Sequence, residues 1–203
     1  MKVMFLTGSC WMRDKQNNLL PFVRSEDFIN AFTAHGDQLV YPPIYWYEGN
    51  YMFPYLEKII ENNNIDLIIG YSAGGHPGFH LCNKYKIKGI HFNPAIAITS
   101  EAPTLQILPD DYKNIQPFKE QVMVIGAEDR KHKGGVDGHL VVRDLEKMGF
   151  DNGGEILIIP GLAHDVPIQM FTIVFDYYRE LWWGKSVIES NDQRVLVDFE
   201  HFA

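Results

Sequence analysis

Cysteine is scarce in this sequence, which has only two, Cys10 and Cys82, among 203 residues. Neither belongs to a CxxC pair or to the cysteine and histidine spacing of a zinc site, so no disulfide framework and no structural metal are expected. Long hydrophobic runs are also missing, because the apolar stretch at 3–6 ends at Thr7 and Gly8, well short of the roughly 20 residues of a membrane helix. These absences predict a soluble protein with free thiols and favour a cytoplasmic location.

Basic residues are outnumbered, with 18 lysines and arginines against 26 aspartates and glutamates, which gives a net charge of -8 at pH 7. This excess of negative charge opposes binding to phosphate backbones and anionic lipids, so we expect neither nucleic acid nor a membrane surface as a partner. The basic run at 130–133 has two interpretations, a solvated loop or a site that attracts an anionic group. Hydrophobic residues make up 46% and aromatic residues 13%, which excludes a disordered chain and predicts a globular one.

Apolar runs alternate with helical periodicities along the chain. Strands are predicted at 2–6, 39–44, 66–70, 87–92, 121–125 and 155–159. Helices are predicted at 25–34, 55–61, 73–85, 138–148 and 167–183. Continuous apolar strands that alternate with helices are typical of a parallel sheet covered on both faces, so we expect an α/β fold with three αβα layers and a mostly parallel, doubly wound sheet.

The order of these elements predicts a single domain over 1–184. The connection at 96–120 contains three prolines and is longer than a routine loop, so it either forms a small cap over a site or decorates the surface. The tail at 185–203 follows the last predicted helix, and its alternating stretch at 194–202 would suit an edge strand or a dimer contact. The oligomeric state therefore stays open.

Residues 70–74, Gly-Tyr-Ser-Ala-Gly, form a G-x-S-x-G motif between the most apolar predicted strand and a predicted helix. This position is typical of a nucleophile elbow, in which the serine occupies a strained turn and the small residues let the helix and the strand approach closely. The helix that follows points its first amides toward the charge that develops on a substrate oxygen. The motif predicts Ser72 as a nucleophile, and the alternative is a tight turn whose serine only caps the helix.

A serine hydroxyl is a weak nucleophile at neutral pH, so a base and an orienting acid are needed as well. Two later predicted strands end just before Glu128 and Asp129 and just before His164. Because the carboxyl ends of parallel strands meet at one edge of the sheet, these side chains should lie near Ser72. The chain order of serine, acid and histidine matches the order that accompanies this type of elbow. Asp129 is the expected acid, and Glu128 remains an alternative.

With these residues, the chain resembles the α/β-hydrolase superfamily over about 2–183, and in particular its compact, nearly lidless serine esterases. The resemblance implies that Ser72 is the nucleophile and that His164 acts first as general base and then as general acid. It implies that Asp129 holds the imidazole in one tautomer. It also implies that the reaction requires no cofactor.

The resemblance further implies an oxyanion hole made by the backbone amides of Ser9 and Ala73. Family members usually carry a histidine where this sequence has Thr7, which leaves the loop geometry open but not the supply of backbone donors. Seven aromatic residues between positions 41 and 55 either wall a substrate pocket or pack an irregular loop. The positions that we expect to contact substrate are Tyr71, Cys10, Trp11 and Trp46.

These residues predict a serine hydrolase that cleaves a small carboxylic ester or thioester through an acyl-enzyme. The same triad would also serve an acyltransferase or a peptidase, and a binding module without catalysis is a third alternative. His76 and His80 have the spacing of metal ligands on a helix, but no third ligand accompanies them in the sequence, so no metal is expected. The expected partner is a small acyl ester or thioester.

Overall fold

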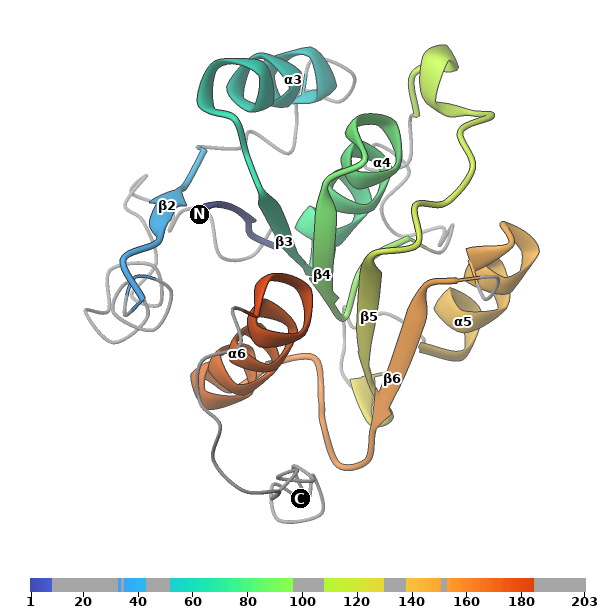
Figure 1. The fold of residues 1–203 in the computed structure, drawn as a ribbon. Helices are drawn as coiled ribbons and strands as arrows, with labels where there is room; N and C mark the ends of the chain where they lie inside the picture. The colour runs from blue at the N-terminus through green and yellow to red at the C-terminus, as the bar shows by residue number, and fades with distance from the viewer. Residues whose placement is uncertain are drawn as a thin grey trace, which may run out of the picture.

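The computed structural model describes residues 1–8, 33, 35–42, 52–96, 108–129, 138–150 and 153–184, and six strands within these ranges form one sheet (Figure 1). The order across the sheet is β2-β1-β3-β4-β5-β6, and every neighbouring pair is parallel. The strands are β1 (Lys2–Leu6), β2 (Gln38–Val40), β3 (Leu67–Tyr71), β4 (Lys88–Phe92), β5 (Gln121–Gly126) and β6 (Glu155–Ile159).

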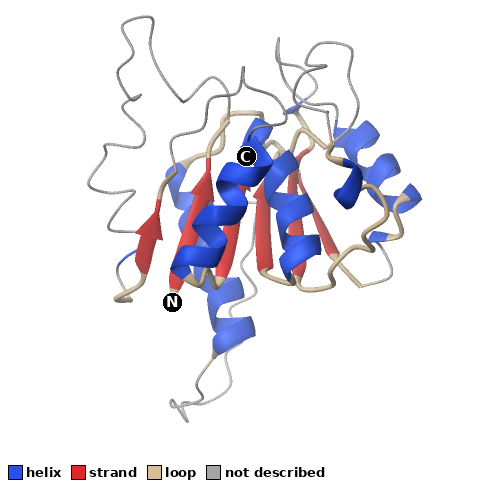
Figure 2. Ribbon diagram, turned by 90° about the horizontal axis from the view of Figure 1, so that it is seen from above, coloured by secondary structure: helices blue, strands red, loops and turns tan. Residues whose placement is uncertain are grey.

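Helices cover both faces of this sheet (Figure 2). The α-helices in the described part of the chain are α3 (Met52–Asn63), α4 (Gly75–Tyr85), α5 (Gly138–Lys147) and α6 (Ile168–Trp183). The side chains of α6 pack on one face, whereas those of α3, α4 and α5 pack on the other. This all-parallel, three-layer arrangement confirms the fold class that the sequence predicts.

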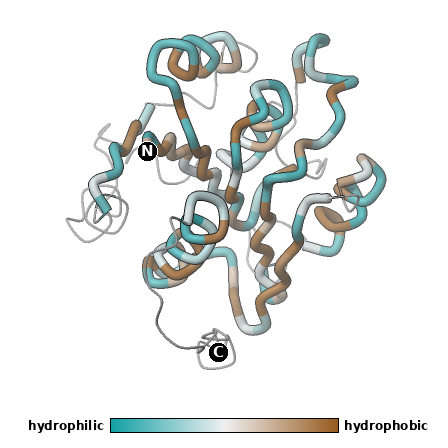
Figure 3. Tube along the Cα trace, in the orientation of Figure 1, coloured by the Kyte–Doolittle hydropathy of each residue, from teal (hydrophilic) through white to brown (hydrophobic). Residues whose placement is uncertain are grey.

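The central strands are mostly apolar because both of their faces are covered, whereas the edge strands β2 and β6 carry exposed residues. In β1, Val3 and Phe5 belong to the cluster under α6, whereas Met4 and Leu6 belong to the cluster under α3 and α4. This alternation follows from the two-residue repeat of a strand. All five residues of β3 are buried, and Figure 3 shows hydrophobic colour on the central strands.

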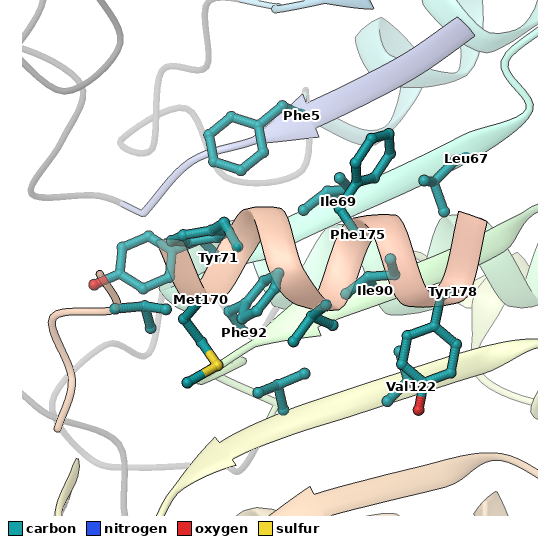
Figure 4. Close-up of a cluster of buried hydrophobic side chains, with 14 of the residues drawn as sticks. Phe5, Leu67, Ile69, Tyr71, Ile90, Phe92, Val122, Met170, Phe175 and Tyr178 are labelled. Carbon is teal, nitrogen blue, oxygen red and sulfur yellow. The ribbon is translucent and has the colours of Figure 1, made fainter. Parts of the chain in front are cut away.

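The cluster under α6 holds many of the aromatic side chains of the core. Figure 4 shows Phe175 and Tyr178 of α6 directed at residues of the central strands. The ring centroid of Phe171, also on α6, lies 4.1 Å from that of Phe92. Burial of one such ring stabilises the fold by roughly 1.5–3 kcal/mol, so α6 is a main support for the strand ends that it covers.

The strand order reverses between β1 and β3, the second and third strands of the sheet. From β1 the chain first moves outward to β2, and it then returns to the other side of β1 and proceeds from β3 to β6. In open parallel sheets, ligands bind at the carboxyl edge where such a reversal occurs. The topology therefore marks the ends of β1 and β3 as the place to look for a site.

The element boundaries agree with the sequence predictions in most places and differ in three. The predicted strand at 39–44 is shorter, since β2 ends at Val40 before Pro42, which has no N–H for a sheet. The predicted helix at 55–61 is longer, since α3 begins at Met52 and accommodates Pro54 in its first turn. The predicted helix at 73–85 divides into the 3₁₀ turn η3 (Ser72–Gly74) and α4.

Several predicted segments fall largely or wholly outside the described residues. The helix at 25–34 is described only at Thr33, and the tail at 185–203 is described at no position. The connection at 96–120 is described at Ile96 and from 108 onward, where it includes the 3₁₀ turn η5 (Asp110–Tyr112). Among the described helices, none has the length and apolar character needed to cross a membrane.

Candidate active site

Ser72 occupies a strained turn at the carboxyl end of β3. Its φ of 51° lies in the left-handed region, which residues with a side chain rarely adopt. The 3₁₀ turn η3 begins at this residue and continues into α4, so the first amides of the helical segment surround the serine. This is the geometry of a nucleophile elbow, and it includes the strained turn at the serine that the sequence motif predicts.

Glycines make the turn sterically feasible. A Cβ atom added to Gly74 would lie 2.0 Å from the carbonyl oxygen of Leu6 in β1, so no other residue fits there. A Cβ atom added to Gly8 would lie 2.9 Å from Cβ of Ser72. The end of β1 therefore runs directly against the serine, as the strand reversal between β1 and β3 requires.

Three side chains form a chain of hydrogen bonds at this edge. The Oγ atom of Ser72 lies 3.0 Å from Nε2 of His164, and Nδ1 of His164 lies 2.8 Å from Oδ1 of Asp129. A carboxylate accepts hydrogen bonds only, so Nδ1 carries the proton and Nε2 is free to accept the serine proton. Asp129 is 1% exposed, whereas Ser72 and His164 are 7% and 8% exposed. The histidine and the serine are thus the members nearest to solvent.

The loops that carry Asp129 and His164 are bonded to each other. Asp129 follows β5 by three residues, and His164 follows β6 by five. The backbone N–H of Ala127 donates to the carbonyl of Ile159 at 3.0 Å, and that of Glu128 donates to Leu162 at 3.0 Å. The parallel pairing of β5 with β6 therefore continues into the two loops and brings the acid to the histidine.

The structure distinguishes the expected acid from its alternative. Asp129, and not Glu128, is the carboxylate within hydrogen-bond distance of Nδ1 of His164. After the histidine, the chain stays extended through Pro167, the N-cap of α6, before the helix begins at Ile168.

Asn93 is a site residue that the sequence analysis missed. It follows β4 directly, with a φ of 42°, and its side chain is buried. Its Nδ2 atom donates to the carbonyls of Ala163 at 2.8 Å and His164 at 3.1 Å, and its Oδ1 atom accepts from the N–H of Gly126 at 2.7 Å. An asparagine at a strand end, tolerant of the left-handed region, was the only available signal.

Tyr71 was expected to contact substrate, but its side chain is 0% exposed. Its hydroxyl donates to the carbonyl of His164 at 2.8 Å, and its ring centroid lies 5.7 Å from that of the imidazole. Figure 4 shows the ring within the cluster under α6, with its oxygen directed out of it. Besides its contact with the histidine loop, the ring packs against that of Phe171 at a centroid distance of 5.7 Å.

The expected oxyanion donors are described only in part. Ala73 is the second residue of η3, so its N–H is among the first of a helical segment, which have no partner within the helix. Gly8, the residue before Ser9, contacts Ser72, but Ser9 itself lies outside the described residues. The expected substrate contacts Cys10, Trp11 and Trp46 also lie outside them, as does the basic run at 130–133.

Two of the seven aromatic residues expected around a pocket have defined packing partners in the described part of the chain. The ring of Tyr41 stacks on that of Phe5 at a centroid distance of 6.1 Å. Phe53 is buried in α3, and its ring centroid lies 4.6 Å from that of Tyr112. Both rings therefore contribute to packing between elements.

Buried histidines lie on α4 and on β4. The ring centroids of His76 and His80 in α4 lie 4.8 Å apart, and Nε2 of His91 in β4 donates to the Oε1 atom of Gln121 at 3.0 Å. Burial lowers the pKa of His76 and of His91 to about 4, so both rings are neutral at pH 7. Within the described ranges, no three histidine, cysteine, aspartate or glutamate side chains lie close enough together to hold a metal ion.

No family model and no curated protein sequence matches this chain. Several solved structures are similar to this chain. MGS-MChE2, an α/β-hydrolase enzyme from the metagenome of lagoon sediments of Mar Chica in Morocco, has a TM-score of 0.61 at 12% identity, over 89% of this chain and 91% of its own. SOBER1 from Arabidopsis thaliana has a TM-score of 0.58 at 15% identity, over 89% and 98%.

The esterase domain of a Rhodothermus marinus protein is similar as well, with a TM-score of 0.56 at 10% identity over 88% of this chain and 86% of its own. At identities this low, the similarity concerns the fold and not the activity. Each of these three matches covers 88% or 89% of this chain. The chain therefore has the α/β-hydrolase fold.

Proposed function

We propose that the protein is a serine hydrolase that cleaves a small carboxylic ester or thioester. The observation that carries this proposal is the unbroken chain of hydrogen bonds from Ser72 through His164 to Asp129. Two further facts support it. The serine sits at an elbow with a left-handed φ, and two of the similar structures are called esterases, one from Rhodothermus marinus and one from a marine microorganism.

In the proposed reaction, Oγ of Ser72 attacks the acyl carbon while Nε2 of His164 takes the hydroxyl proton. Asp129 keeps the other ring nitrogen protonated and stabilises the imidazolium. The N–H of Ala73, together with that of Ser9, donates to the oxyanion that forms on the carbonyl oxygen. When the tetrahedral intermediate collapses, the bond to the leaving group breaks and His164 gives its proton to the departing alcohol or thiol.

The acyl-enzyme is then hydrolysed by the reverse sequence of proton transfers. His164 takes a proton from a water molecule, and the hydroxide attacks the acyl carbon bound to Ser72. The ester bond to the serine breaks, Oγ regains the proton from the imidazolium, and the carboxylic acid leaves. Every proton moves through one ring nitrogen, which is why the distance between Oγ and Nε2 matters most.

A fluorophosphonate probe tests the proposal, because it labels only an activated serine. We expect labelling of the wild-type protein and none of Ser72→Ala, together with hydrolysis of a small activated ester such as p-nitrophenyl acetate. Cys82→Ala is the matched control, since burial raises the pKa of the Cys82 thiol and keeps it unreactive. Labelling that persists in folded Ser72→Ala, or a folded wild type that is not labelled, would contradict the proposal.

A further inference from the structure

Asn93 stands between the two strands that carry the nucleophile and the acid. It follows β4, which pairs with β3 on one side and with β5 on the other. Its own N–H donates to the carbonyl of Val124 in β5 at 2.8 Å, which fixes its backbone to the neighbouring strand. The left-handed φ then turns its side chain toward the carboxyl edge, and asparagine tolerates that conformation better than most residues do.

Both the nitrogen and the oxygen of the Asn93 side-chain amide form hydrogen bonds. Nδ2 donates to the carbonyls of Ala163 and His164 in the loop of the base, at 2.8 and 3.1 Å. Oδ1 accepts from the N–H of Gly126 at the start of the loop of the acid, at 2.7 Å. One planar group therefore bonds both loops, in addition to the backbone hydrogen bonds that join the two loops directly.

Tyr71 supplies a second donor to the same carbonyl. Its hydroxyl lies 2.8 Å from the carbonyl oxygen of His164, so that oxygen accepts two hydrogen bonds in a buried place. Tyr71 directly precedes Ser72, and the carbonyl of Ser72 accepts from the N–H of Ala95, two residues after Asn93. The backbone of the base is therefore bonded to residues that adjoin the nucleophile.

We propose that Asn93 is a positioning residue for the triad, with Tyr71 as its partner. The inference rests on the proposed function. His164 sits in a loop without regular secondary structure, so its imidazole needs external bonds to stay between Ser72 and Asp129. The side chain of Asn93 touches no reacting atom, and it acts by holding the carbonyl of the histidine and the loop of the acid in register. A shift of about 1 Å in such a site can lower the rate about 100-fold.

Asn93→Asp tests this role with little change of shape. Aspartate tolerates the same backbone conformation and keeps an acceptor for the N–H of Gly126, but it cannot donate to Ala163 and His164 when ionised. We expect kcat for a small activated ester to fall about 10- to 100-fold while KM changes by less than about threefold, because substrate contacts are intact. Asn93→Gly keeps the left-handed φ and removes both the donor and the acceptor of the side chain, so kcat should fall by at least as much.

Asn83→Asp is the matched control. Asn83 is equally buried, but it bonds the N–H of Phe118 and the side chain of Gln121. Gln121 is the first residue of β5, at the end of the strand opposite Asp129, so this variant should keep the wild-type kcat per folded molecule. A kcat for Asn93→Asp at the wild-type level, or an equal loss in Asn83→Asp, overturns the proposal.

A second pair of variants isolates the other donor. Tyr71→Phe removes one of the two bonds to the carbonyl of His164, and we expect a loss in kcat of about three- to tenfold. Tyr112→Phe is its control, since Tyr112 is also buried and its hydroxyl bonds Glu57. The double variant Asn93→Asp with Tyr71→Phe leaves the carbonyl without either donor, so its loss should exceed the product of the single losses. A simple product would overturn the shared role of the two donors.

Failure of this inference can be told apart from failure of the proposed function. If the folded wild type neither hydrolyses esters nor reacts with the fluorophosphonate, the function fails, and the readout becomes the NMR signal of the proton on Nδ1 of His164. In the wild type that proton is held by Asp129, and in Asn93→Asp we expect its signal to broaden or vanish through exchange with water. A signal unchanged from wild type overturns the positioning role whatever the activity.

Discussion

His164 and His76 are both buried histidines, 8% and 5% exposed, but their ring nitrogens differ in hydrogen bonding. His164 sits in a loop beyond β6, and both of its ring nitrogens have partners, Ser72 and Asp129. His76 sits in the first turn of α4, and among the residues that the structure describes neither of its ring nitrogens has a hydrogen-bond partner. The comparison teaches that burial alone does not make a histidine a base, and that the partners of its two nitrogens decide.

The two histidines also differ in whether a neighbour can stabilise a charged ring. In the proposed mechanism, Asp129 stabilises the imidazolium that forms when His164 accepts a proton. The aromatic rings described near His76 are those of Phe53 and His80, at 6.3 Å and 4.8 Å between ring centroids. Burial lowers the pKa of His76 to about 4, so this ring stays neutral and serves as packing.

The largest expected difference between the two histidines is in kcat, when each ring is removed in turn. His164→Leu should lower kcat about a million-fold while the protein stays folded, because the base is lost. His76→Leu should keep kcat within about threefold of wild type, because an apolar side chain replaces a ring without hydrogen bonds. Initial rates on an activated ester, with circular dichroism as the check of folding, measure both. Full activity in His164→Leu would remove the basis of the proposed mechanism.

A second test separates the acid from its neighbour. Asp129→Asn should lower kcat about 10⁴-fold, since the amide favours the wrong tautomer of His164. Glu128→Gln makes the same change one residue earlier, where the carboxylate is not the partner of Nδ1, and should keep kcat within about threefold. The ratio of the two rates is the measurement. Equal losses would show that the carboxylates are interchangeable, which contradicts the geometry.

The smallest effect concerns stability in acid. His76 and His91 have a pKa of about 4 in the folded protein, below the usual value of about 6.5 in an unfolded chain. The unfolded state therefore binds more protons between pH 6.5 and 4, and the free energy of unfolding should fall there by about 1.4 kcal/mol per pH unit for each ring. Urea unfolding at pH 7 and pH 5 measures this loss.

His76→Leu supplies the control for that titration. It removes one of the titrating rings, so the loss of stability between pH 7 and pH 5 should shrink by about 2 kcal/mol. An identical slope in wild type and His76→Leu would mean that the pKa of the His76 ring is the same in the folded and the unfolded state.

Much of the fold could be predicted because a local run of apolar residues marks each central strand. The run at 67–69 is wholly apolar since β3 is covered on both faces, and β6 was predicted with the same first and last residues that it has. Ends that depend on other segments were less predictable. The start of α3 at Met52 depends on packing against α4 and β1, which no local pattern records.

The order Ser72, Asp129, His164 could be predicted because the three positions follow strands, and parallel strands bring their ends together. The role of Asn93 could not, since its partners lie 33 and 70 residues away in sequence at Gly126 and Ala163. A single polar residue after a strand is equally consistent with an ordinary turn. The contact of Tyr71 with the histidine loop was hidden for the same reason.

The all-parallel sheet also affects the kinetics of folding. Parallel neighbours cannot be joined by a tight hairpin, so each pairing must close a long crossover before it contributes stability. The candidate site lies at the ends of β1, β3, β4, β5 and β6, and its hydrogen bonds join residues far apart in sequence, such as Tyr71 and His164. During refolding, we therefore expect the proposed esterase activity to return after helical structure does.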